Sequence, residues 1–157
     1  MTDIVTQIER WVDENRDDCI QFFQETLAIP SPSYKEKEVA EFLVGKMKEY
    51  GYSSSFVDEL NDALGLIKGT GGGRSFLLNG HIDHVPAGDM VDPFSGKIMD
   101  GEELGDHGEV IYGRAACDMK GAVAAMVLAG KLLNELGIKL KGDYKVAGVS
   151  QEEVGGM

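Results

Sequence analysis

The sequence predicts a layered α/β domain, helical in its first part and built from strands and loops in its second. Glycine is unevenly distributed along the chain. The sequence has 21 glycines, and only Gly45 and Gly51 lie in residues 1–64. The apolar residues change their spacing at about the same place, from every three or four positions to short runs. This is the change from helical to strand periodicity. The sequence contains no internal repeat, so a single domain is the expected unit.

Two helices are predicted in the first part. Apolar residues with helical spacing extend over residues 3–27, which predicts one amphipathic helix. Two prolines within residues 29–32 end that helix. Ser33 and Glu36 then have the three-residue spacing of a capping box, so we expect them to start a second helix. That helix should end at Gly51, a residue suited to a left-handed cap.

The second part predicts four strands and one more helix. The strands are expected at residues 52–57, 63–68, 75–79 and 144–149. The third helix is expected over residues 119–136, ended by Gly137. The glycine-rich residues 69–74 lack the Gly-Lys-Ser/Thr ending of a phosphate-binding loop, so they are interpreted as a turn between strands. The acidic residues 102–109 are expected in a surface hairpin.

The charge of the chain excludes some partners. Its 27 Asp and Glu residues outnumber its 15 Lys and Arg residues, which gives a net charge of −12. Such a surface repels nucleic acid and anionic membranes and attracts cations. The longest apolar run, residues 121–130, has about half of the ~20 residues that a transmembrane helix needs. We therefore expect no nucleic-acid partner and no membrane association.

The cysteines and the N-terminus indicate the compartment. Cys19 lies in the first predicted helix and Cys117 lies in a motif described below, so no disulfide framework is implied. The first residues lack the basic and then apolar order of a secretory signal. We expect a cytoplasmic protein.

The first candidate site is the segment from Gly80 to Asp83, directly after an apolar run. In an extended backbone, residues two apart face the same side, so Asp83 can lie beside the ring of His81 and fix its tautomer. This arrangement suits an imidazole that binds a metal through its other nitrogen. A polar loop without a metal is the alternative. His84 could compete as a ligand, but it points to the opposite face from Asp83 and is interpreted as a structural residue or as one that supports a ligand.

The second candidate is Asp118, where a loop enters the third predicted helix. A carboxylate in that position can accept backbone N–H bonds or bridge two cations. Taken alone, Asp118 would be only a helix cap. Its neighbour Cys117 would need a cationic environment to act as a nucleophile with His81, and the surroundings are acidic. Cys117 is therefore interpreted as a packed small residue.

The third candidate is the pair Glu152 and Glu153, directly after the last predicted strand. Adjacent side chains at a strand end point in different directions, so one can bind a metal while the other meets a water molecule. A Glu pair on its own is usually a surface feature. The three candidates together favour a site, because each borders an apolar strand or opens a helix, where α/β sheets place their ligands.

Imidazole and carboxylate ligands without thiolates suit zinc, with cobalt or manganese as alternatives. If Asp118 bridges two divalent ions about 3.5–4 Å apart, the pair can polarise a carbonyl and lower the pKa of a bound water. A glutamate that is not a ligand can then carry a proton from that water to a leaving amine. The pattern therefore indicates a two-metal hydrolytic site, which His107 of the acidic hairpin is not expected to join.

Three motifs, in this order, resemble a known family. They are residues 81–89 (HIDHVPAGD), 113–121 (GRAACDMKG) and 151–156 (QEEVGG), with residues 92–96 (DPFSG) between the first two. The sequence is similar to the co-catalytic zinc metallopeptidases that include succinyl-diaminopimelate desuccinylase, acetylornithine deacetylase, aminoacylase and glutamate carboxypeptidase. Within that family it looks nearest to a branch labelled selenium-metabolism-linked hydrolase. The resemblance implies a three-layer α/β catalytic domain and a cis peptide bond between Asp118 and Met119.

The resemblance also implies a role for each motif residue. His81 corresponds to the terminal ligand of one metal, and Asp83 corresponds to the carboxylate that orients it. Asp118 corresponds to the ligand that bridges the two metals. Glu152 corresponds to the general base, and Glu153 corresponds to the terminal ligand of the other metal.

By the same resemblance, residues 1–157 match the N-terminal part of a catalytic domain, with a mixed sheet flanked by helices. Residues 1–157 contain no counterpart of the third ligand for each metal, of the lid or dimerisation domain, or of the C-terminal catalytic segment. We therefore expect a hydrolase of amide bonds in N-acyl amino acids or small peptides, whose isolated chain binds metal weakly and turns over little. A complementary C-terminal chain or a homodimer is the expected protein partner. The alternative is a non-catalytic α/β fragment that binds a divalent metal or a complementary chain.

Overall fold

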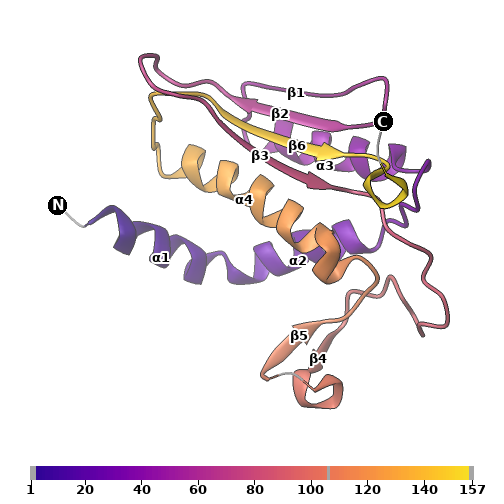
Figure 1. The fold of residues 1–157 in the computed structure, drawn as a ribbon. Helices are drawn as coiled ribbons and strands as arrows, with labels where there is room; N and C mark the ends of the chain where they lie inside the picture. Colours follow the sequence, from indigo (N-terminus) through magenta and orange to yellow (C-terminus); the bar gives the residue numbers. More distant parts are fainter. Residues whose placement is uncertain (1–2, 106, 156–157) are drawn as a thin grey trace.

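The computed structural model describes residues 3–105 and 107–155 and contains a four-stranded mixed sheet with helices packed on it (Figure 1). Its strands are β1 (Ser54–Val57), β2 (Ala63–Ile67), β3 (Phe76–His81) and β6 (Tyr144–Val149). They lie in the order β1, β2, β6, β3. Strand β2 is antiparallel to both β1 and β6, whereas β3 is parallel to β6. The predicted α/β class is confirmed, and each of the four predicted strands is found with its ends shifted by at most two residues.

The parallel pair β3 and β6 positions the candidate site. In their register, Gly80 pairs with Gly148 and His81 pairs with Val149. Both strands therefore end at the same edge of the sheet, and the segments that follow them leave from neighbouring positions (Figure 1). The chain between the two strands includes helix α4 (Gly121–Glu135), as expected for parallel strands, which need a long crossover connection.

The N-terminal helical region is divided in two. The structure has α1 (Ile4–Glu14) and α2 (Arg16–Leu27) where one helix over residues 3–27 is predicted, so that prediction is wrong. The backbone of Asn15 (φ −109°, ψ 14°) leaves the helical range, and its side-chain Nδ2 donates to the carbonyl oxygen of Trp11. Asparagine side chains compete for backbone bonds in this way, which apolar spacing does not reveal. None of the described helices is long and apolar enough to cross a membrane.

Helix α3 (Lys37–Glu49) begins without the predicted capping box, because no side chain caps its first turn. The hydroxyl of Ser33 instead donates to Asp83 at 2.7 Å, and the carboxylate of Glu36 accepts the N–H of Gln151 at 3.1 Å. These partners lie 50 and 115 residues away along the chain, so the local spacing cannot show them. The end of the helix is confirmed, because Gly51 follows it with a left-handed φ of +76°.

The core lies between the sheet and the helices α3 and α4. Its fully buried side chains include Leu43 and Met47 of α3, Val123 and Val127 of α4, and Ala63 and Val146 of the strands. Glycine is needed at position 65 of β2, because a Cβ there would lie 2.9 Å from Cδ1 of the buried Tyr52. Helix α2 packs against α3 and α4.

The opposite face of the sheet carries apolar side chains that the described helices leave open. Phe56 and Leu77 are 54% and 57% exposed. They border a hollow together with Leu64, Leu66 and Ala147. Because side chains alternate along a strand, the sheet presents this apolar surface in addition to its buried one. Exposed apolar patches of this kind are typical of interaction surfaces.

A hairpin projects from the body of the molecule (Figure 1). Its strands β4 (Ile98–Asp100) and β5 (Glu109–Ile111) are antiparallel, which confirms the predicted surface hairpin. Arg16 at the start of α2 contacts it through an ion pair with Glu109 at 3.0 Å. The glycine-rich residues 69–74 lie between β2 and β3, as predicted for a connecting turn.

Candidate metal centre

His81 ends β3 and is almost fully buried, with 5% of its surface exposed. Its Nδ1 atom lies 3.1 Å from the carbonyl oxygen of Asp83 and 3.3 Å from the carboxylate of the same residue. Two acceptors on this side favour the tautomer that carries its proton on Nδ1. The Nε2 atom then remains an acceptor or ligand, and it faces Asp118, whose Oδ1 lies 2.9 Å away.

The surroundings of His81 are electrostatically negative. Burial by itself lowers the pKa of this imidazole. In the protonated imidazole, however, Nε2 can donate to Asp118, and this hydrogen bond, the backbone bond to Asp83 and the charges of both carboxylates together outweigh burial. The net result is a pKa of His81 above its ordinary value. Surroundings that favour a proton on the imidazole also favour a metal cation beside it.

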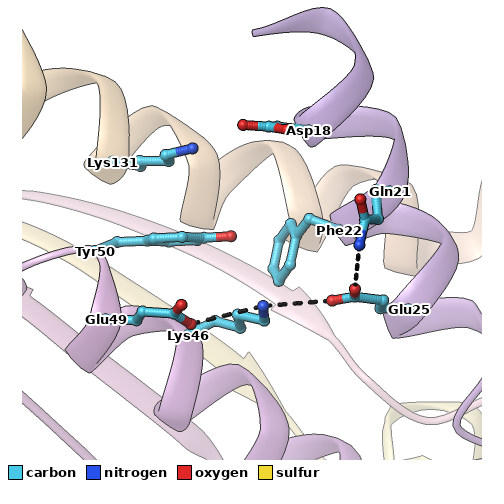
Figure 2. Close-up of a pocket in the computed structure, with 8 residues that line it drawn as sticks. All are labelled: Asp18, Gln21, Phe22, Glu25, Lys46, Glu49, Tyr50 and Lys131. Carbon is cyan, nitrogen blue, oxygen red and sulfur yellow. Dashed lines mark hydrogen bonds and ion pairs between the residues drawn. The ribbon is translucent and has the colours of Figure 1, made fainter.

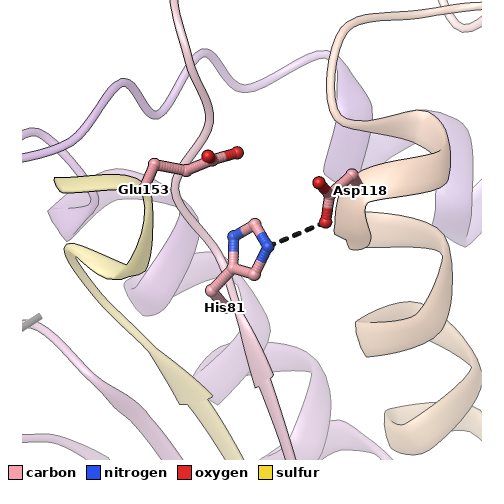
Figure 3. Close-up of side chains that lie close together, drawn as sticks. All are labelled: His81, Asp118 and Glu153. Atoms are coloured by element: carbon pink, nitrogen blue, oxygen red, sulfur yellow. Dashed lines mark hydrogen bonds and ion pairs between the residues drawn. The ribbon is translucent and has the colours of Figure 1, made fainter. Parts of the chain in front are cut away.

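Asp118 lies in an irregular turn, Ala116–Lys120, that precedes α4. The peptide bond between Asp118 and Met119 is cis, as the family resemblance implies. The side chain of Asp118 is 79% exposed and points toward His81 (Figure 3). Gly80 allows this turn to approach β3, because a Cβ there would lie 2.8 Å from Cε of Met119.

Cys117 is exposed, so the interpretation of this residue as a packed side chain is wrong. The irregular backbone at Asp118 and Met119 delays the start of α4 from the predicted residue 119 to Gly121, and the side chain of Cys117 is left in solvent. Within residues 3–105 and 107–155, neither Cys117 nor His107 belongs to a cluster of metal-ligating side chains.

Glu152 and Glu153 begin a short 3₁₀-helix, Glu152–Val154, at the end of β6. Glu153 turns toward His81 and Asp118, and one ligand atom from each of these three residues lies within 4.8 Å of the others (Figure 3). The Oε2 atom of Glu152 lies 3.9 Å from Nε2 of His81, and its side chain is 58% exposed. The structure therefore brings the three candidate segments of the sequence together at one edge of the sheet.

Asp83 connects the ends of the two parallel strands. Its carboxylate is fully buried and accepts the backbone N–H groups of Glu152 and Glu153, each at 3.2 Å. It also accepts the hydroxyl of Ser33 at 2.7 Å. The residue beside the imidazole of His81 thus also holds the backbone of two other site residues. Strand alternation predicts the contact with His81 but not these amide bonds, because they join residues 69 and 70 positions apart.

Two further acids hold the same segment and were not predicted as site residues. Glu36 accepts the N–H of Gln151 at 3.1 Å, and Asp62 accepts the N–H of Ser150 at 2.8 Å. Glu36 is fully buried. Neither acid belongs to a local metal-site motif, because Glu36 has the spacing of a helix cap and Asp62 follows an asparagine in a turn.

His84 and Lys120 are buried near the site without joining its cluster. Nε2 of His84 accepts the N–H of Ser31 at 2.9 Å, and its Nδ1 lies 2.7 Å from the carbonyl oxygen of Val85. Its role is therefore structural, as predicted, and burial lowers its pKa. Burial also lowers the pKa of Lys120, to about 8, and its Nζ donates to the carbonyl oxygen of Ile29.

Among the residues that the structure describes, the carboxylates of the site face the imidazole of His81 rather than a lysine or arginine. Within the described part of the chain, no lysine or arginine forms an ion pair with Asp118, Glu152 or Glu153. An uncompensated set of carboxylates around an imidazole acceptor is the donor chemistry that a divalent cation requires.

A second group of charges, the charged hollow, lies between α2, α3 and α4 (Figure 2). It is lined by Asp18, Gln21, Phe22, Glu25, Lys46, Glu49, Tyr50 and Lys131. Here acids and bases pair with each other, because Nζ of Lys46 lies 3.4 Å from Glu25 and 3.6 Å from Glu49. Acids that already have a cationic partner gain less from an added metal ion, so we assign no metal to the charged hollow.

Comparison with known proteins identifies the family. Residues 77–157 match the family described as Peptidase family M20/M25/M40. The chain is 33% identical over 140 residues to the uncharacterized protein YgeY of Escherichia coli (strain K12), covering 87% of this chain and 32% of YgeY. It is 33% identical over 144 residues to succinyl-diaminopimelate desuccinylase of Methylocella silvestris, covering 86% of this chain and 35% of that protein. The chain thus spans about a third of the length of the curated relatives it matches.

The fold is also found in solved structures. Human carnosine dipeptidase 1 superposes with a TM-score of 0.82 at 20% identity, over 98% of this chain and 36% of that one. This likeness shows a shared fold. The family match begins in β3 and includes the five predicted site residues, which lie between positions 81 and 153. The chain therefore belongs to peptidase family M20/M25/M40.

Proposed function

We propose that this chain provides the metal-binding edge of a metal-dependent hydrolase that cleaves amide bonds in N-acyl amino acids or small peptides. The observation that carries the proposal is the convergence of His81, Asp118 and Glu153, whose ligand atoms lie within 4.8 Å of one another. One imidazole and two carboxylates without a thiolate are typical donors of catalytic zinc sites. Membership of the family supports the same chemistry.

The residues fit two divalent cations that share one ligand. His81 and Asp118 would hold one ion, and Asp118 and Glu153 would hold the other. The side chain of Asp118 is 79% exposed, which suits a carboxylate that offers an oxygen to each ion. Zinc is the proposed metal, with cobalt or manganese as alternatives. When bound, such ions act as Lewis acids toward an amide carbonyl and lower the pKa of a water molecule.

Glu152 is the proposed general base. Its carboxylate lies 3.9 Å from the imidazole of His81, is 58% exposed and stands outside the cluster of three ligands. From that place it can take a proton from an attacking water on one oxygen and give it to the nitrogen of the leaving amine. Asp83 supports both steps, because it orients His81 and holds the backbone N–H of Glu152.

The substrate class rests on the relatives. One is named a succinyl-diaminopimelate desuccinylase, and one structural neighbour is named a dipeptidase. We take from these names the proposal that the protein acts on an acylated amino acid or a small peptide. The free cysteines Cys19 and Cys117 suit a reducing compartment such as the cytoplasm.

Calorimetric titration with zinc tests the site itself. We expect the unmodified chain to bind zinc. His81→Ala and Asp118→Ala should each weaken zinc binding by more than about a hundredfold, which is a larger loss than that expected when a group only supports a ligand. Glu25→Ala removes an acid of the charged hollow and should leave binding unchanged. Unchanged binding in both site variants would disprove the ligand assignment.

Hydrolysis of N-acetyl amino acids and dipeptides with zinc or manganese tests the reaction. Because the chain spans about a third of its relatives, we propose that each ion takes a further ligand from outside residues 1–157. We therefore expect turnover when the remaining segments of a family member are added, and little without them. Glu152→Gln should lower that turnover by at least about a hundredfold and keep zinc binding. Turnover that survives Glu152→Gln would reject Glu152 as the base.

A second candidate role, the binding of a complementary chain without catalysis, is favoured by the open face of the sheet. Phe56 and Leu77 are more than half exposed there and form part of an apolar patch. In this role, Leu77→Lys should abolish association measured by sedimentation, while Asp118→Ala should not change it. Association that is insensitive to Leu77→Lys would exclude this face as the binding surface.

A further inference from the structure

The segment 150–153, which follows β6 and leads into the site, is held by carboxylates rather than by the sheet. Four successive backbone N–H groups donate to side-chain carboxylates, Ser150 to Asp62 at 2.8 Å, Gln151 to Glu36 at 3.1 Å, Glu152 to Asp83 at 3.2 Å and Glu153 to Asp83 at 3.2 Å. Gln151 has a left-handed backbone (φ 60°, ψ 22°). Such a backbone helps successive N–H groups to form a concave, anion-binding surface. Here the anions are supplied by other loops of the same chain.

From this arrangement we infer that Glu36 is a positioning residue, whose buried carboxylate aligns the segment 150–153 so that Glu153 reaches the cluster with His81 and Asp118. The chemical purpose of this alignment rests on the proposed function. The hydrogen bonds that provide it involve no metal, so they can be tested separately.

Glu36 joins two loops through a single oxygen. Its Oε1 accepts the N–H of Tyr34 at 2.8 Å as well as the N–H of Gln151 at 3.1 Å. The residue is fully buried, and within the described chain its Oε2 has no hydrogen-bond partner. A buried carboxylate oxygen without a partner opposes folding. We therefore expect Glu36 to have a role other than stabilising the fold. Its contacts indicate that this role is to set the geometry of the site.

Both loops that Glu36 joins lead to the site. The loop before α3 contains Ser33, whose hydroxyl donates to Asp83 at 2.7 Å. The other loop begins at Gln151 and continues into the residues held by Asp83. The two loops and the two acids form a closed ring of contacts. Glu36 binds a backbone N–H of each loop, and Asp83 binds the hydroxyl of Ser33 in one loop and two backbone N–H groups in the other. Loss of Glu36 opens the ring while Asp83 still holds Glu153, so we expect misalignment of the segment without unfolding.

Amide hydrogen exchange of the metal-free chain, measured by NMR, is the first test. Glu36→Ala should speed exchange of the Gln151 N–H by at least about tenfold, because its acceptor is lost. Glu36→Gln should cause a smaller increase, because a neutral acceptor binds the N–H more weakly than a carboxylate does. If Glu36→Ala does not fold, Glu36→Gln carries the test. If the Gln151 N–H exchanges in the folded variants at the same rate as in the unmodified chain, the inference is overturned.

Asp143→Asn is the matched control. Asp143 also accepts a backbone N–H from a loop, that of Gly69 at 3.0 Å, but it directly precedes β6, whereas segment 150–153 follows that strand. This variant should leave exchange at Gln151 unchanged. An equal acceleration in Asp143→Asn would show a general loss of stability and would overturn the specific role of Glu36.

Cobalt binding, followed by the visible absorption of the ion, tests the consequence for the site. Glu36→Ala should weaken cobalt binding roughly tenfold to a hundredfold, as is typical for groups that support a ligand without touching the metal, and should change the spectrum. Glu36→Gln should lie nearer the unmodified chain, and Asp143→Asn should match it. Unmodified cobalt affinity in Glu36→Ala would overturn the inference. If the unmodified chain binds no cobalt, zinc or manganese, the proposed function fails, whereas exchange still decides whether Glu36 holds the segment.

Discussion

Two groups of charged side chains in this protein differ in how their charges are compensated. In the charged hollow, Lys46 lies between Glu25 and Glu49 at 3.4 and 3.6 Å. At the edge of the sheet, Asp118 and Glu153 approach the imidazole of His81 and have no lysine or arginine partner within the described residues. Both groups are rich in acids, so a count of acids does not separate them. Uncompensated negative charge around a fixed imidazole is what marks the candidate metal centre.

The two groups also differ in what holds their acids. The acids of the charged hollow project from helices into partly exposed ion pairs, whose net stabilisation is small. At the sheet edge, the buried carboxylates of Glu36 and Asp83 accept backbone N–H groups of the segment that carries the site. Removing a buried acceptor of this kind leaves donors without partners, which costs more than losing an exposed pair. The site is therefore expected to be the more rigid of the two regions.

The largest effect on stability is expected at Asp83. Asp83→Ala leaves the Ser33 hydroxyl and two backbone N–H groups without their acceptor and should lower the free energy of unfolding by about 3 kcal/mol. Glu25→Ala should cost less than about 1 kcal/mol, because its ion pair with Lys46 is partly exposed. Urea unfolding followed by circular dichroism measures both variants. Equal losses would remove the contrast between the two regions.

A smaller effect at Lys131 tests whether the charged hollow is held by charge or by packing. Its Nζ lies 5.2 and 5.6 Å from the ring centres of Tyr50 and Trp11, and its side chain is 12% exposed. Lys131→Ala should lower the free energy of unfolding by about 1–2 kcal/mol. Lys131→Met keeps the apolar stem and should cost less than about 1 kcal/mol. If both variants lower the free energy of unfolding by the same amount in urea, the charge of Lys131 rather than the packing of its stem stabilises this region.

The smallest effect is a pH dependence from His84, which sharpens the electrostatic contrast with His81. Burial lowers the pKa of His84, so the folded chain resists a protonation that the unfolded chain undergoes near its ordinary pKa of about 6.5. The stability contributed by neutral His84 is therefore complete above about pH 6.5 and is lost as the pH falls through the lowered pKa.

Urea unfolding of the unmodified chain and of His84→Gln, from about pH 7.5 to about pH 5.5, measures this dependence. The loss of stability on acidification should be smaller in His84→Gln, by up to about 1 kcal/mol. His81, whose pKa is raised, contributes with the opposite sign in both proteins, so the difference between them isolates His84. Identical pH profiles would exclude His84 as a source of the dependence.

The fold could be predicted from the sequence wherever one periodic pattern extends over an element. Strand β6 is found at the predicted residues, and Gly51 follows the predicted end of α3. The errors at Asn15 and Glu36 have one physical cause. In both cases a polar side chain bonds to backbone atoms, of Trp11 in the first case and of Gln151 in the second. Neither the apolar spacing used for the first helix nor the capping-box spacing used for the second carries information about these bonds.

The candidate site could be predicted as residues but not as a geometry. His81, Asp118 and Glu153 stand out because each lies at the end of a strand or near the start of a helix, and because their motifs resemble one family. Their proximity depends on the parallel register of β3 and β6, in which His81 pairs with Val149. No local pattern specifies that pairing. Their roles as metal ligands stay predictions until the titrations are done.

The hairpin of β4 and β5 offers a place to modify the protein without disturbing the four-stranded sheet. Its ion pair to the body, Arg16 with Glu109, has side chains 57% and 68% exposed and so adds little to stability. Exposed Glu102 and Glu103 lie between its two strands in a short 3₁₀-helix, Gly101–Leu104. An exposed hairpin tip of this kind is a site where insertions are tolerated and proteases have access. A fluorescent tag inserted there would let binding to the sheet edge be followed in solution without altering any residue of that edge.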